Sequence, residues 1–167
     1  RNNHLKPFIV VASAGTTDTG AVDPLNKIAD VAEKNKLWFH VDAAYGGFFI
    51  LSEKKKHLFE GISRSDSLVI DPHIGFFLPY GLGTVLIKKA DAVLESHHYV
   101  ANYMEGAYEG ATIYSPADLS PELTKHFRGL RLWMALKLHG LEPFVANLNE
   151  KILLTHYFLA EVEELGF

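Results

Sequence analysis

Strand, helix and strand patterns follow one another near the start of the chain, and this order restricts the fold more than any other feature. Phe8–Ala12 is a continuous apolar run rich in β-branched residues, which indicates a strand covered on both faces. Asp23 as the N-cap and Pro24 at the first helical position predict a helix that runs to about Asn35. Leu37–Val41 is the next predicted strand. Because such units are right-handed, we expect a mostly parallel sheet with flanking helices.

Helical spacing and later patterns define the remaining elements. The expected buried face of the first helix consists of Leu25, Ile28, Val31 and Ala32. Ser67–Ile70 and Gly83–Lys89 are predicted strands, and about 99–119 is irregular and rich in Gly, Tyr and Ser. Ser120 is expected to cap a helix that reaches about His139, and a long helix is expected from about Glu142. We expect 1–119 to belong to one α/β domain and 120–167 to lead into a second, smaller domain.

The composition of the 167 residues is that of a globular protein with a substantial core. Hydrophobic residues make up 48% of the chain and the formal net charge is −4, without a basic stripe that would bind nucleic acid. No apolar run approaches the ~20 residues that span a bilayer. We therefore expect a cytoplasmic protein without a nucleic-acid or membrane partner. Because Arg1 lies only a few residues before a buried strand, we also expect a piece of a longer polypeptide.

Polar residues gather in the three loops that follow predicted strands, where parallel sheets bind their ligands. In "HVDAAYGG", strand alternation places His40 and Asp42 on one side, with Asp42 at the strand end. A partly desolvated carboxylate there needs a cationic or hydrogen-bonding partner. Ala44 leaves room for a flat group against the backbone. Two interpretations stay open: Asp42 binds a ligand, or it caps a turn beside a core histidine.

The other two loops add hydroxyls, backbone amides, a carboxylate and a histidine. "SAGTTDTG" contains Thr16 and no bulky side chain, although this pattern is also typical of an ordinary loop. "IDPHIGFF" places Asp71 and His73 after a neighbouring strand. His97 and His98 have no other ligand at suitable spacing, so we expect no metal site. The three loops fit a carboxylate that serves a protonated heteroaromatic nitrogen, with a histidine nearby.

Four segments of the chain resemble one known family. "GTTDTGAVDP", "HVDAAYGG", "DSLVIDPH-x-G" and "SPELTKHFRGLRLWMALKLHG" are similar to segments of the group II pyridoxal-phosphate-dependent amino acid decarboxylases, which have the aspartate-aminotransferase-like fold type I. The resemblance covers nearly the whole chain. It implies pyridoxal 5'-phosphate (PLP) as cofactor, an L-amino acid as substrate and a homodimer. It also implies that 1–119 is the C-terminal part of the PLP-binding large domain and that 120–167 enters the small C-terminal domain.

The resemblance also implies roles for single residues. Asp42 corresponds to the carboxylate that pairs with the pyridine nitrogen, which needs a close negative charge to stay protonated at neutral pH. His40 stands in the same strand and is expected to orient Asp42. Ala44 corresponds to the small residue against the ring face, and Thr16 to the threonine beside the ring. The protonated ring is the electron sink for the carbanion that decarboxylation leaves.

The third loop departs from the family pattern at one position. His73 corresponds to the histidine before the Schiff-base lysine, but the lysine itself is replaced by Ile74. Asp71 occupies the place of a polar residue on the phosphate side, where its own charge requires water or His73 in between. An isoleucine cannot form the covalent bond or transfer the lysine's protons. Three explanations stay open: an altered or misread lysine, a deliberate substitution that traps a ligand, or a natural inactivation.

The resemblance leaves the substrate and one catalytic residue open. Tyr103, Tyr108 and Tyr114 are candidates for the tyrosine of the family's catalytic loop, which reaches across a dimer. The ring-stacking side chain and the phosphate cradle would precede Arg1. Aromatic-acting relatives share "HVDAAY", which favours decarboxylation of an aromatic L-amino acid to the amine and carbon dioxide. The alternatives are a related PLP-dependent carbon–carbon lyase and a non-catalytic relative that only binds a ligand.

Overall fold

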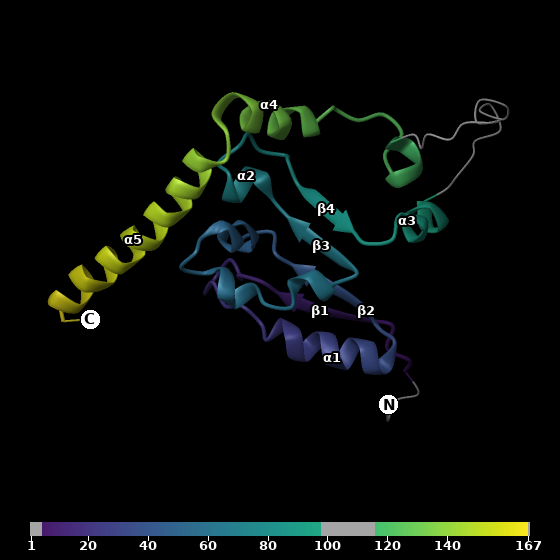
Figure 1. Ribbon diagram of the computed structural model, residues 1–167, viewed down its shortest axis with the longest axis horizontal. Coiled ribbons are helices and arrows are strands. Elements are labelled where there is room, and N and C mark those ends of the chain that lie inside the picture. Colours follow the sequence, from purple (N-terminus) through teal and green to yellow (C-terminus); the bar gives the residue numbers. More distant parts are fainter. Residues whose placement is uncertain (1–4, 98–115, 167) are drawn as a thin grey trace. The chain divides into compact units, whose positions relative to one another are not determined.

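The structure is a computed structural model that describes residues 5–97 and 116–166 (Figure 1). It divides into two compact units, one formed by Arg1–Leu86 with Arg128–Phe167 and the other by Ile87–Phe127. The proposed domain boundary at 119/120 stays a prediction. The candidate catalytic-loop residues lie outside the described residues, namely Tyr103, Tyr108 and Tyr114.

A mixed four-stranded sheet with the order β1-β2-β3-β4 forms the centre of the fold. Its strands are β1 (Ile9–Ser13), β2 (Trp38–Asp42), β3 (Ser67–Ile70) and β4 (Thr84–Ile87). β1 pairs with β2 and β2 pairs with β3, both in parallel. Figure 1 shows β4 running in the opposite direction beside β3. The predicted α/β fold with a mostly parallel sheet is therefore confirmed.

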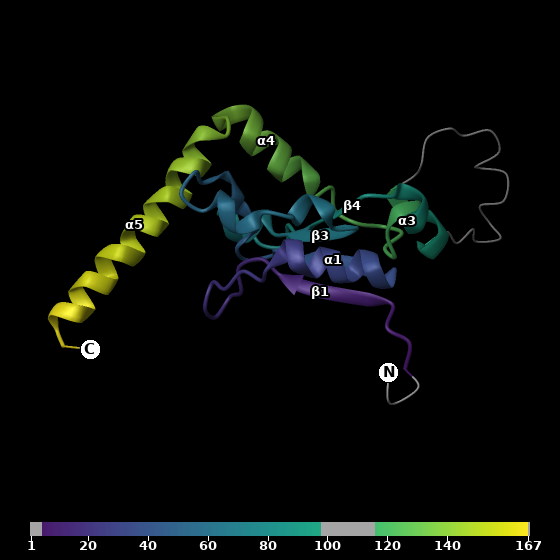
Figure 2. The same ribbon diagram turned by 60° about the horizontal axis from the view of Figure 1, so that its bottom comes forward.

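Helix α1 (Leu25–Asn35) packs along β1 and β2 and closes one face of the sheet (Figure 2). Leu25, Ala29 and Ala32 are its buried residues, and they form one core cluster with Phe39 of β2 and others. The prediction that Val31 is buried is wrong, because its side chain is 52% exposed. Ala29 and Ala32 contact the sheet instead, and their small side chains allow the helix to lie close to it.

The start of α1 also differs from the predicted cap. Pro24 holds the N-cap position, and no side chain caps the helix there. The carboxylate of Asp23 accepts a hydrogen bond from the amide of Ser13 at 2.8 Å instead. Asp23 therefore stabilises the end of β1 rather than the first turn of the helix.

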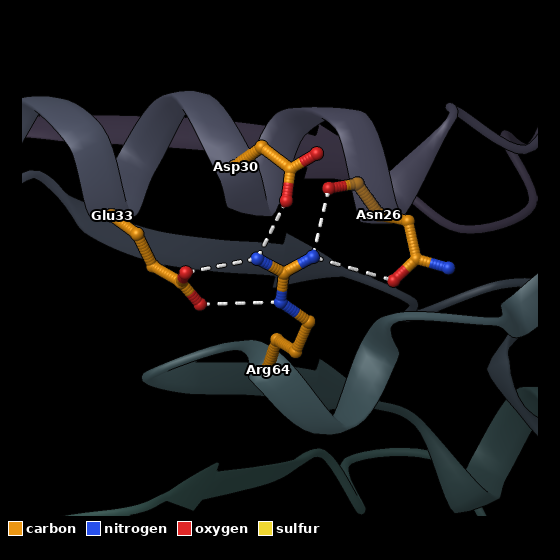
Figure 3. Close-up of polar contacts among 4 residues, drawn as sticks. All are labelled: Asn26, Asp30, Glu33 and Arg64. Atoms are coloured by element: carbon orange, nitrogen blue, oxygen red, sulfur yellow. Dashed lines mark hydrogen bonds and ion pairs between the residues drawn. The ribbon is translucent and has the colours of Figure 1, made fainter.

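The chain between β2 and β3 consists of three short 3-10 helices, η1 (Gly47–Leu51), η2 (Lys56–Phe59) and η3 (Ile62–Arg64). Arg64 joins η3 to α1, as Figure 3 shows. Its guanidinium lies 2.8 Å from Asp30 and 3.0 Å from Glu33, and it donates to the carbonyl oxygen of Asn26 at 3.1 Å.

Helix α5 (Glu142–Glu164) begins where the sequence predicts, after a turn at Gly140. Its buried residues are Leu148 and Ile152, and Ser52 of the preceding η1 region donates to Asn149 Oδ1 at 2.6 Å. Helix α2 (Pro72–Gly75) is a single turn after β3.

Helix α4 (Gly129–His139) starts later than the sequence predicts. The prediction that Ser120 caps this helix is wrong. The hydroxyl of Ser120 bonds with the carbonyl oxygens of Pro116 and Glu122, and therefore organises the turn after η5 (Pro116–Leu119). In this second unit η5 contacts helix α3 (Ala90–His97).

The helices of the described residues range up to the 23 residues of α5. None of their helices is long and apolar enough to cross a membrane. No group of three or more potential ligand residues in this part of the chain could hold a metal ion.

Candidate cofactor site

Backbone hydrogen bonds between neighbouring strand ends bring the three predicted loops together. The amide of Ala14, after β1, donates to Asp42 O at 2.7 Å. The amide of Asp71, after β3, donates to Ala44 O at 3.3 Å. The polar residues of all three loops consequently share the carboxyl edge of the sheet, which is where parallel sheets bind ligands.

Two glycines hold the first two loops at backbone contact. A Cβ atom added at Gly15 would lie only 2.5 Å from Gly46 Cα, and Gly15 has a φ of +93° that side chains rarely adopt. A Cβ atom added at Gly75 of α2 would lie 2.4 Å from the ring of Phe48. The loops therefore have no room for side chains at these contacts, which fixes the shape of the edge.

Asp42 ends β2 as an exposed residue with one of its two carboxylate oxygens in use. Oδ1 accepts a hydrogen bond from the amide of Ala44 at 3.1 Å, which is an Asx turn. No described residue bonds to Oδ2. The open interpretations for Asp42 are thus compatible, because the turn fixes the carboxylate while one oxygen stays available to a ligand.

His40 bonds to a neighbouring strand and not to Asp42. Its Nδ1 lies 2.7 Å from Ser67 Oγ, and the indole nitrogen of Trp38 donates to the same oxygen at 2.7 Å. Within the described residues, no hydrogen bond joins His40 to Asp42, although both occupy the same face of β2. Sequence patterns missed Ser67, whose role follows from the pairing of His40 with Ser67 across β2 and β3.

Thr16 and Ala44 are half-buried at the same edge. The hydroxyl of Thr16 lies 2.9 Å from that of Thr19 and accepts a bond from the amide of Ala21 at 3.1 Å. The loop after β1 is therefore held by its own hydrogen bonds.

The third loop pairs its two polar residues with each other. His73 Nδ1 lies 2.9 Å from the carbonyl oxygen of Leu82, and since a carbonyl only accepts, this nitrogen carries the hydrogen. His73 Nε2 lies 3.9 Å from Asp71 Oδ2, and both side chains are largely buried. The two polar side chains of this loop are therefore neighbours, and the bond from His73 Nδ1 to Leu82 fixes the direction of the ring.

Ile74 lies in the first turn of α2, where its amide donates to Asp71 O at 3.0 Å. It lines a cavity of about 860 Å³ bounded by the loops and by α5. None of the other predicted cofactor residues lines this cavity. Lys55 and Lys151 line the same cavity as Ile74. Sequence patterns do not connect either lysine with position 74.

Comparison with known proteins decides the family. The model of the pyridoxal-dependent decarboxylase conserved domain matches residues 1–166. The chain belongs to this family. It also resembles individual pyridoxal-dependent decarboxylases in sequence and in structure.

Two curated relatives have the same identity to the chain but different substrates in their names. An aromatic-L-amino-acid decarboxylase of Bacillus atrophaeus is 37% identical over 157 residues, covering 92% of this chain and 32% of the relative. An L-2,4-diaminobutyrate decarboxylase of Acinetobacter baumannii is 37% identical over 147 residues, covering 87% of this chain and 29% of the relative. The chain therefore spans about a third of the length of these relatives.

A solved structure supports the fold and the cofactor of the family. The crystal structure of Oryza sativa TDC with PLP and tryptamine aligns with a TM-score of 0.80 at 29% identity. The alignment covers 87% of this chain and 30% of that one. The predicted fold type I architecture and family cofactor are thus confirmed at the level of the family.

The residues of this chain fit PLP in one respect and not in another. The free oxygen of Asp42 and the small residue Ala44 suit a planar, protonated ring held without a covalent bond. Ile74 offers no amine for the covalent bond. The correspondence of position 74 with the Schiff-base lysine of the family stays a prediction.

Proposed function

We propose that the full-length protein uses PLP to decarboxylate an L-amino acid to its amine and carbon dioxide. The free carboxylate oxygen of Asp42, fixed at the carboxyl edge of a sheet in a pyridoxal-dependent decarboxylase domain, is the observation that carries this proposal. When bound, PLP supplies the electron sink for the carbanion that forms as carbon dioxide leaves. Asp42 keeps the ring nitrogen protonated by placing a negative charge beside it.

The other residues of the edge bind and orient. Ala44 would leave space for the ring face, and Thr16 would lie beside the ring. His73, 3.9 Å from Asp71, would lie on the phosphate side of the bound cofactor beside that carboxylate. His40 lies on the same face of β2 as Asp42, and we propose that it helps to orient that side chain without a direct hydrogen bond.

We place the substrate in the aromatic class, in line with the Bacillus relative, although the diaminobutyrate relative is equally similar. We further propose a cytoplasmic homodimer, with 1–119 in the large domain and 120–167 entering the small one. Exposed apolar residues on α4 and α5, such as Trp133 at 58% and Phe158 at 68% exposure, support packing against further protein. Light scattering of the full-length protein gives the oligomeric state.

Ile74 favours a second function, a relative that binds PLP or a similar planar anion without catalysis. With isoleucine at this position no amine is available for the covalent bond, while Asp42, Ala44 and Thr16 remain in place. Both functions use the same edge of the sheet, and they differ in whether a lysine at position 74 restores turnover.

The experiment compares full-length wild-type protein with an Ile74→Lys variant. We expect both to bind PLP, and only the variant to form a covalent adduct that borohydride reduction fixes at residue 74. The variant should release carbon dioxide at least about 100-fold faster than wild type from an aromatic L-amino acid, because the lysine supplies both attachment and proton transfer.

Three other results would redirect the proposal. PLP binding without carbon dioxide release in the Ile74→Lys variant would establish the non-catalytic function. Release of an aldehyde without carbon dioxide would identify the carbon–carbon lyase. Faster turnover of diaminobutyrate than of aromatic amino acids would overturn the aromatic assignment.

A further inference from the structure

A buried serine joins two aromatic side chains on the face of the sheet that carries Asp42. Ser67 is 7% exposed, and its Oγ lies 2.7 Å from both Trp38 Nε1 and His40 Nδ1. Its hydroxyl has one hydrogen to donate and two lone pairs to accept with. The donor and acceptor roles of the three groups can therefore be worked out by counting.

Trp38 settles the first role, because an indole N–H only donates, and it occupies one lone pair of Ser67. If His40 Nδ1 also donated, both lone pairs would be used and the hydroxyl hydrogen of Ser67 would need another acceptor. No described residue provides one, and a buried donor without a partner is costly. If Ser67 donates to His40 Nδ1 instead, the indole N–H of Trp38, the hydroxyl of Ser67 and His40 Nδ1 all have partners. His40 Nδ1 is then an acceptor, and the ring hydrogen lies on Nε2.

We propose that Ser67, oriented by Trp38, holds His40 in its Nε2–H tautomer and makes it a positioning residue for Asp42. His40 and Asp42 alternate with the buried Phe39 and Val41, so both occupy the face opposite the core. In this tautomer His40 presents an N–H group, not a lone pair, on that face. A donor that reaches the Asp42 carboxylate from this face would favour its ionised form, which pairing with a protonated ring nitrogen requires. The link to Asp42 rests on the proposed function, whereas the tautomer does not.

Solid-state NMR of full-length protein with ¹³C,¹⁵N-labelled histidine tests the tautomer directly. The His40 signals are those that disappear in a His40→Gln variant. Correlation of Cδ2 with a protonated nitrogen identifies Nε2–H, and this is the expected wild-type result. A hydrogen on Nδ1 of wild-type His40 would overturn the proposal without any need for a variant.

Three serine variants separate the hydroxyl's role from general packing. Ser67→Ala should shift part of the His40 population to the Nδ1–H tautomer, while Ser67→Thr, which keeps a hydroxyl, should retain the wild-type spectrum. Ser65→Ala is the matched control, because the Ser65 hydroxyl donates to Ile62 O and not to His40. An unchanged tautomer in Ser67→Ala would show that the serine does not set it.

Fluorescence titration with PLP tests the connection to Asp42. We expect the dissociation constant of Ser67→Ala to rise about tenfold and that of Ser65→Ala to stay unchanged, as for a weakened hydrogen bond to a charged group. Equal affinity of Ser67→Ala and wild type would overturn the positioning role. A wild-type protein with the Nε2–H tautomer but no affinity for PLP would support the tautomer assignment and contradict the proposed function.

Discussion

The two faces of the sheet are built from alternate residues of the same strands but serve different ends. On the face under α1, Phe39 and Val41 are 2% and 0% exposed and pack among alanines and leucine. On the other face, Trp38 and His40 are half-buried and Asp42 is exposed. One face holds the fold together by burial of apolar area, and the other carries hydrogen-bonded groups in fixed directions. Substitutions on the two faces should therefore fail in different measurements.

The largest expected loss of stability is on the face of the sheet under α1. Phe39→Ala should lower the free energy of unfolding by about 3–5 kcal/mol, because it removes a buried ring and leaves a cavity. Denaturant unfolding of the full-length protein measures this loss. The neighbouring Trp38→Phe should cost clearly less, since the new ring fills most of the space. Equal losses for the two substitutions would contradict the distinction between the faces.

A second substitution tests the close backbone contact between Gly46 and Gly15 at the carboxyl edge of the sheet. Gly46→Ala should cost about 3 kcal/mol, because the added Cβ would lie 2.5 Å from Gly15 Cα and neither backbone has space to move away. Gly81→Ala is the control: Gly81 has a φ of +84° but nothing within 4 Å of the added Cβ, so we expect about 1 kcal/mol from strain alone. Thermal unfolding compares them, and a Gly46 variant as stable as wild type would contradict the close contact.

The position of Asp42 was predictable, whereas its surroundings were not. Strand periodicity and the rule for carboxyl ends locate Asp42, Ala44 and His73 at one edge from local patterns alone. The link from His40 to Ser67 depends on the register between β2 and β3, which pairs two residues that are 27 positions apart in the chain. No local pattern contains that information.

Competition between local signals explains the errors in the helices. Val31 is more hydrophobic than Ala29, yet the alanine is buried, because close approach to the sheet favours a small side chain. Ser120 is a good capping residue in isolation, but its hydroxyl bonds with nearby carbonyl oxygens and does not cap α4.

On the face opposite α1, Asp42→Asn should weaken PLP binding without changing the free energy of unfolding. We expect the dissociation constant for PLP to rise at least about tenfold, because the amide provides no negative charge for the ring nitrogen. The free energy of unfolding should stay within about 0.5 kcal/mol of wild type, since Asp42 is exposed. Asp18→Asn, in the loop after β1, is the charge-matched control and should leave affinity unchanged. Unaltered binding in Asp42→Asn would remove the main support for the cofactor site.

The smallest effect is expected at Arg64, which belongs to neither face and joins η3 to α1. Arg64→Ala should cause a slight loss of stability that shrinks in high salt, because these ion pairs are solvent-exposed. Hydrogen bonds to Asp30 and then Glu33 raise the pKa of Arg64. A raised pKa means that Arg64 stays charged through the neutral range, so the stabilisation is lost on the alkaline side only in strongly alkaline solution, and on the acid side only where the two carboxylates become protonated. Thermal unfolding at several pH values should therefore show a constant difference from wild type across the neutral range.

The backbone around Ile74 has a consequence for substitutions at this position. The turn is held by bonds from Ile74 N and Gly75 N to Asp71 O, and by bonds from His73 to Leu82 O. None of these bonds uses the side chain at position 74, so the scaffold tolerates exchange there without being rebuilt. Isoleucine and lysine codons can differ by a single base. Where the isoleucine codon is AUA, a single base change therefore introduces an amine at position 74 and leaves these backbone bonds unchanged.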